Sequence, residues 1–94
     1  MEDEIIGQIH FRLGWSIIRT KTDIEMGVEN IKKANIMIPD NQEIMMKLAG
    51  ALFQETGNDD DINYADKVLT RLLELDPNNS EAYILQAKIQ HQRR

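Results

Sequence analysis

The chain has 94 residues, a formal net charge of −5 at pH 7 and no cysteine. Its length predicts one small domain, and its negative charge disfavours nucleic acid as a partner because phosphate binding requires a clustered basic surface. The absence of cysteine excludes a disulfide scaffold, a thiol nucleophile and a thiolate metal site.

Apolar residues recur with helical spacing along the whole chain and predict five helices, at residues 4–20, 23–37, 42–54, 62–75 and 80–92. In the first helix, the predicted buried stripe consists of Ile6, His10, Leu13, Gly14 and Ile17, with Phe11, Trp15 and Ile18 beside it. In the third helix it consists of Met45, Leu48, Ala49 and Leu52. Strand signals are absent, so the expected fold class is all-α.

Helix starts are predicted from three capping boxes, in which a polar side chain and a Glu three residues later satisfy free backbone amides. These boxes are Thr22 with Glu25, Asp40 with Glu43, and Asn78 with Glu81. Pro39 and Pro77 are expected to close the second and fourth helices. Residues 57–61 are predicted to form an acidic turn.

One pattern of small and aliphatic residues occurs twice, about 38 residues apart. A small residue is followed after four positions by an aliphatic, after seven by another apolar residue and after twelve by a proline. The residues are Gly27, Ile31, Ala34 and Pro39 in the first copy, and Ala65, Leu69, Leu72 and Pro77 in the second. Repetition at this period predicts stacked helical hairpins, whose typical role is to hold another protein.

Together with Leu13-Gly14 and Leu48-Ala49, this pattern resembles the tetratricopeptide repeat (TPR) family. The resemblance implies a right-handed stack of two helical hairpins and a C-terminal capping helix, which form a single domain over residues 1–94. The first repeat would span about residues 7–41, the second about 42–79 and the capping helix about 80–92. The chain departs from the family pattern at His10, where an aromatic is usual, and by about four inserted residues at 58–61.

The TPR resemblance also implies a concave groove lined by the first helix of each hairpin and by the capping helix. The predicted partner-binding residues are Phe11, Trp15, Ile18, Arg19, Met46, Gly50, Phe53, Ile84 and Lys88. Many TPR domains bind two carboxylates through a clamp of Lys, Asn and Arg, but Phe11 and Trp15 occupy the slots of its Lys and Asn, so no such clamp is expected. We expect instead an apolar helix or peptide, with Trp15 as a binding hot spot and a pocket opposite it at Gly50. A core position for Trp15 is the competing interpretation.

The predicted function is therefore a non-enzymatic scaffold or adaptor. An alternative is a homo-oligomerisation domain, such as a homodimer, that buries the same groove. A second alternative comes from residues 11–27, where Phe11, Trp15, Arg19, Lys21 and Gly27 resemble the first repeat of the mitochondrial outer-membrane fission adaptor family. That family carries an N-terminal arm and a C-terminal membrane anchor, and neither is visible in this sequence.

Catalytic, metal and cofactor sites are not expected. His10 and His91 are isolated, and Ser16 lacks the glycine elbow of a serine hydrolase. Residues 59–61 lack the alternating ligands of a calcium loop. The acidic start of the chain is unlike a signal peptide, and no apolar run reaches the about 18 residues of a membrane span. We expect a cytoplasmic protein, or one at the cytosolic face of an organelle, with a protein or peptide as its partner.

Overall fold

The computed structural model describes residues 2–92, which form helices and no strand. The elements are α1 (Glu2–Thr20), α2 (Ile24–Met37), α3 (Gln42–Ala51), η1 (Leu52–Thr56), α4 (Asp59–Leu75) and α5 (Ser80–Gln92). η1 is a wide π-helical turn that continues α3. The predicted all-α class and the five helices are confirmed. Within the described range, no helix is both long and apolar enough to cross a membrane.

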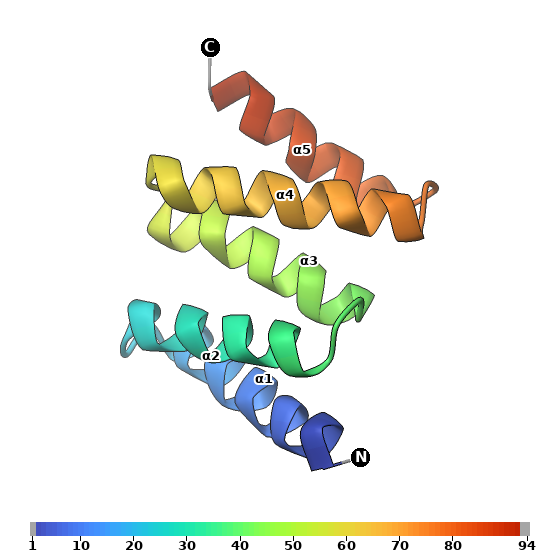
Figure 1. Ribbon diagram of the computed structural model, residues 1–94. Coiled ribbons are helices and arrows are strands. Elements are labelled where there is room, and N and C mark those ends of the chain that lie inside the picture. Colours follow the sequence, from blue (N-terminus) through green and yellow to red (C-terminus); the bar gives the residue numbers. More distant parts are fainter. Residues whose placement is uncertain (1, 93–94) are drawn as a thin grey trace.

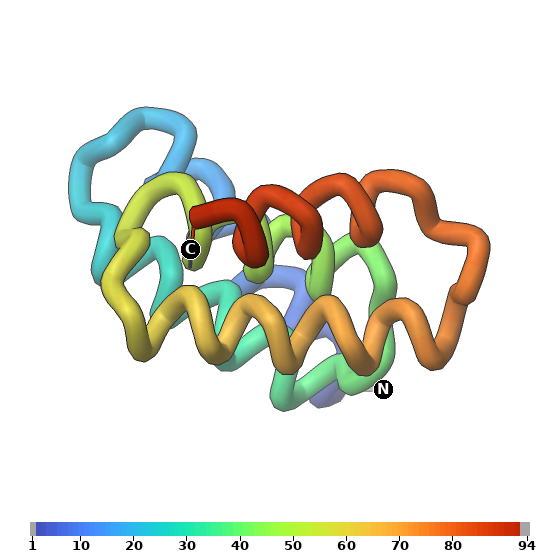
Figure 2. The backbone as a smooth tube through the Cα atoms, turned by 90° about the horizontal axis from the view of Figure 1, so that it is seen from above, coloured from blue at the N-terminus to red at the C-terminus, as the bar shows by residue number. Residues whose placement is uncertain are grey.

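The helices stack in chain order, with α1 at one end and α5 at the other (Figure 1). Each helix packs on the next, α1 on α2, α2 on α3, α3 on α4 and α4 on α5, and α1 also reaches α3. Short connections reverse the chain between neighbouring helices (Figure 2). The stack therefore consists of antiparallel neighbours that share one continuous core.

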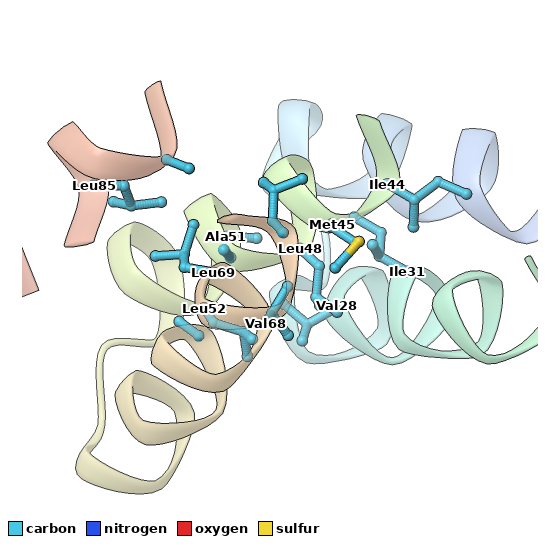
Figure 3. Close-up of a cluster of buried hydrophobic side chains, with 14 of the residues drawn as sticks. Val28, Ile31, Ile44, Met45, Leu48, Ala51, Leu52, Val68, Leu69 and Leu85 are labelled. Carbon is cyan, nitrogen blue, oxygen red and sulfur yellow. The ribbon is translucent and has the colours of Figure 1, made fainter. Parts of the chain in front are cut away.

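The repeated pattern lies in that core. All six of its non-proline residues are buried: Gly27, Ile31, Ala34, Ala65, Leu69 and Leu72. The predicted inner face of the third helix is buried as well, and Leu48, Met45 and Leu52 lie among side chains from α2 and α4 (Figure 3). The spacing of apolar residues therefore identified the faces through which these helices pack.

Two glycines set the distance between α1 and α2. A Cβ added to Gly14 would lie 2.6 Å from the carbonyl oxygen of Gly27, and one added to Gly27 would lie 3.0 Å from the carbonyl oxygen of Gly14. Backbone contacts this close leave no room for a side chain at either position. The backbones of α1 and α2 therefore touch at Gly14 and Gly27, and the side chains of Ile18 and Ile31 pack beside this contact.

The rotation of α1 differs from the predicted one. Its buried residues are Gly7, Phe11, Gly14 and Ile18, whereas Leu13, predicted to be in the core, is 49% exposed. Gly7 and Gly14 explain this rotation, because they lie seven residues apart on one face of α1 and allow that face to approach α2 most closely. Phe11 and Ile18 flank them and are carried inward, and Leu13 is turned out.

Each of the three predicted capping residues is one position too early. The side chains of Asp23, Asn41 and Asn79 accept hydrogen bonds from the amides of Met26, Ile44 and Ala82 at 3.1, 3.1 and 3.0 Å. An N-cap needs extended backbone, but Asp40 has a φ of 64° and so belongs to the turn before the helix. In each box the residue after the predicted cap is also a good capping residue, and it takes the role.

The predicted acidic turn is wrong at its last three residues. Asn58 caps α4, since its Oδ1 accepts a hydrogen bond of 2.8 Å from the amide of Asp61. Asp59, Asp60 and Asp61 form the first turn of the helix, where the positive end of the helix dipole favours carboxylates. Gly57 ends η1 with a φ of 66°, a left-handed conformation that suits glycine. The inserted residues thus cap and extend α4.

Candidate functional site

A hollow of about 300 Å³ opens between α1 and α3 and reaches the start of α5. This volume is at the lower end for ligand pockets and has room for one or two side chains. Its lining residues are Trp15, Ile18, Arg19, Lys21, Met46, Lys47, Gly50, Ala51, Gln54, Glu55 and Glu81. We call it the Trp15 hollow.

Trp15 is half-buried and packs against the core while bordering the hollow. The Nζ atom of Lys47 lies 4.4 Å from the centroid of its ring, within the range of a cation–π interaction. Lys47 is one turn before the end of α3, so this contact holds the ring against that helix. The tryptophan therefore has a defined position and still presents part of its ring to the groove.

Gly50 is the reason that the hollow is open. A Cβ added there would have no heavy atom within 4 Å. Gly50 differs in this respect from Gly14 and Gly27, where a side chain would collide with the neighbouring helix. On the face of α3 that carries Met46, the absence of a side chain at Gly50 leaves free volume beside Trp15.

Charged groups surround the Trp15 hollow. Lys21 pairs with Glu55 at 3.6 Å, measured from Nζ to Oε2, and this pair links the end of α1 to η1. Arg19, Lys47 and Glu81 form none of the ion pairs found within residues 2–92. Two basic groups therefore lie on the α1–α3 side of the hollow, with an acidic group on the α5 side.

A second, shallower hollow of about 650 Å³ lies between η1 and α5. Its lining residues are Phe53, Ile84, Ala87, Lys88, His91 and Gln92. Ile84 is 57% exposed, so this hollow has an accessible apolar surface. We call it the Phe53 hollow.

The structure places the nine predicted groove residues in three groups. The Trp15 hollow gathers Trp15, Ile18, Arg19, Met46 and Gly50, and the Phe53 hollow gathers Phe53, Ile84 and Lys88. Phe11 is 7% exposed and belongs to the core, so its assignment to the groove is wrong. Ile18 is 4% exposed and forms part of the hollow's floor rather than an accessible contact. The rotation of α1 about its glycines accounts for both corrections.

The prediction from sequence did not include Lys47, although this residue contacts the Trp15 ring. A lysine on an amphipathic helix usually extends into solvent, so its type gave no signal. Its position does give one, because Lys47 lies three residues before Gly50 and therefore shares its helix face. Lys21 and Glu55 were missed as well, since their pairing joins segments that are distant in sequence.

A bidentate ion pair lies apart from both hollows. Arg71 on α4 donates from Nε to Oδ1 of Asp40 at 3.1 Å and from Nη2 to Oδ2 at 3.0 Å. These hydrogen bonds hold the pKa of the Asp40 carboxyl below its ordinary value. The pair joins the turn before α3 to α4, so it serves the stack rather than the groove.

His10 also has a structural partner, since its Nδ1 lies 2.8 Å from Oδ1 of Asn30 on α2. Within residues 2–92, no three His, Cys, Asp or Glu side chains come together as a metal site would require. No family model matches the chain, and the curated proteins include no match either.

Proposed function

We propose that this chain is a TPR-type scaffold that binds an apolar helix or peptide of another protein in the groove bordered by α1, α3 and α5. The observation that carries the proposal is the Trp15 hollow, where a half-buried aromatic ring stands beside the free volume left by Gly50. A large aromatic beside a concave site is typical of binding hot spots. The buried repeat pattern supports the family part of the proposal.

The size and chemistry of the hollow specify the partner's anchor. One or two leucine- or phenylalanine-sized side chains would fit in it and contact the Trp15 ring, and Met46 is flexible enough to adapt to their shape. A helix that lies in a groove uses anchors at positions such as i, i+4 and i+7. Later anchors on the same helix would reach the Phe53 hollow.

The unpaired basic groups add a second element of recognition. Arg19 and Lys47 would attract a carboxylate on the partner close to its anchoring side chain, because neither is neutralised by an ion pair within the described residues. We therefore expect a partner segment that is apolar on one face and acidic beside its first anchor. Such binding should weaken with added salt, since exposed charges are screened.

The test is selection of peptides from a random library, followed by affinity measurements with labelled synthetic copies. Trp15 is the one tryptophan of the chain, so a shift of its fluorescence reports directly on occupancy of the groove. Trp15→Ala should weaken binding at least about 30-fold, the effect of losing a hot spot worth about 2 kcal/mol. Gly50→Leu should block binding by filling the hollow.

The matched control is Tyr83→Ala, which removes a 51% exposed aromatic that lines neither hollow. This variant should bind the selected peptides like the parent protein. If Gly50→Leu and Trp15→Ala bind them as tightly as Tyr83→Ala does, the groove is not the binding site and the proposal is wrong.

A further inference from the structure

The outward face of α1 carries a line of exposed apolar side chains. Ile5, Ile9 and Leu13 are 65%, 59% and 49% exposed. They follow one another at intervals of four residues, so they lie along one side of the helix. This side is opposite the buried face that contains Phe11. No other helix of the described chain covers it, because α1 is the end of the stack (Figure 1).

A line of polar residues runs beside the apolar one, at the same interval. It consists of Glu4, Gln8 and Arg12, and with Ile5 and Ile9 it borders a shallow hollow. Glu4 and Arg12 are about 12 Å apart along the helix, too far to pair with each other. Neither takes part in an ion pair within residues 2–92.

We propose that this face binds the same face of a second copy of the chain, with the two α1 helices antiparallel. In a two-fold symmetric pair, each flank of the helix lies against the same flank of the second copy, with the order of residues reversed. Glu4 then lies opposite Arg12 of the second copy, and Gln8 lies opposite Gln8. The two unpaired charges gain a partner at both ends of the contact.

The apolar line is self-complementary in the same arrangement. Ile5 lies opposite Leu13 of the second copy, and Ile9 lies near the two-fold axis opposite itself. The antiparallel direction also sets the positive end of each helix dipole beside the negative end of the other. A second copy therefore matches the face in apolar shape, charge order and direction at once.

This contact leaves the proposed binding groove open. None of the residues that border the shallow hollow on α1 lines the Trp15 hollow. The proposed dimer is thus independent of binding in the groove, and it differs from a dimer that buries the groove. The apolar line is short, and interfaces that bury less than about 1,200 Å² are typically weak and transient. We expect a concentration-dependent dimer with a dissociation constant on the order of 10 µM to 1 mM.

The test is sedimentation equilibrium over this concentration range, with helicity of each variant checked by circular dichroism. Ile9→Glu should raise the dissociation constant at least tenfold. The matched control is Ile36→Glu on α2, because Ile36 is 74% exposed but lies outside the proposed face. It should leave the association unchanged.

A charge exchange tests the antiparallel order. Arg12→Glu and Glu4→Arg should each weaken self-association, because each places like charges opposite one another. An equimolar mixture of these two variants should associate more tightly than either alone, since both ion pairs are restored in the mixed dimer. A monomer at all concentrations, equal effects of Ile9→Glu and Ile36→Glu, or no gain in the mixture would overturn the proposal.

Discussion

The crossing of α1 and α2 predicts opposite effects for one substitution at two glycines. In Gly14→Ala, the new methyl group would lie 2.6 Å from the carbonyl oxygen of Gly27 and 2.8 Å from Cγ1 of Ile31. A backbone oxygen cannot rotate away, so the two helices must separate. Overpacking of this kind costs about 1–3 kcal/mol, and replacing a helical glycine returns about 0.5–1 kcal/mol. Contact with a rigid backbone oxygen places the cost of overpacking in the upper part of its range, so the free energy of unfolding should fall by about 1–2 kcal/mol.

Gly50→Ala should have the opposite sign, because its methyl group would meet no heavy atom within 4 Å. The gain in helix propensity then stands alone, at about 0.5–1 kcal/mol. For a domain of this size, 1 kcal/mol corresponds to about 4–8 °C in Tm. Thermal unfolding followed by circular dichroism should therefore show a Tm about 4–16 °C lower for Gly14→Ala and about 2–8 °C higher for Gly50→Ala. A Gly14→Ala protein as stable as the parent would refute the close crossing.

Two further predictions concern single hydrogen-bonding groups. Asn79→Ala should lower the free energy of unfolding by about 1 kcal/mol, because it removes the cap on the amide of Ala82. The control Asn78→Ala should change this free energy little. Equal losses for the two variants in urea unfolding would contradict the cap assignment. Asp40→Asn should lower the Tm at pH 6, where the carboxylate accepts hydrogen bonds from Arg71 and has a lowered pKa. This difference from the parent should persist down to about pH 4 and shrink as the pH falls through the lowered pKa; a difference that is independent of pH would contradict it.

The helices and their inner faces were predictable because they depend on local periodicity. Ile31 and Leu69 occupy the same slot of a repeated pattern, and both are fully buried. Gly27 and Ala65 likewise share the first slot of the pattern, and both are buried. Information of this kind is contained in the spacing of residues along a single helix.

The rotation of α1 was not predictable from its own residues. This helix is apolar around more than half of its circumference, so several faces fit a core equally well. The deciding contact is between Gly14 and Gly27, which belong to different helices. The choice between Phe11 and Leu13 as core residues follows from that contact. The predicted cap positions were wrong for a similar reason. Two adjacent polar residues could each cap the helix, and the geometry of the preceding turn determined which of them does.

The candidate site was predictable in outline but not in its chemistry. Trp15, Met46 and Gly50 were assigned to one surface from their slots in the repeat, and the structure brings them to one hollow. The position of Lys47 over the Trp15 ring depends on how closely α1 approaches α3. That distance is a property of the stack and not of either helix.

The position of α5 has a consequence for the Phe53 hollow. α5 packs mainly on α4 and contributes Ala82, Leu85 and Ile89 to the core. An element that packs on few neighbours unfolds locally at a lower free-energy cost than one that is packed on both sides. The Phe53 hollow exists while α5 is docked, so its availability follows a local folding equilibrium. A ligand that touched both hollows would shift this equilibrium toward the docked state, and its observed affinity would be reduced by the free energy needed to dock α5.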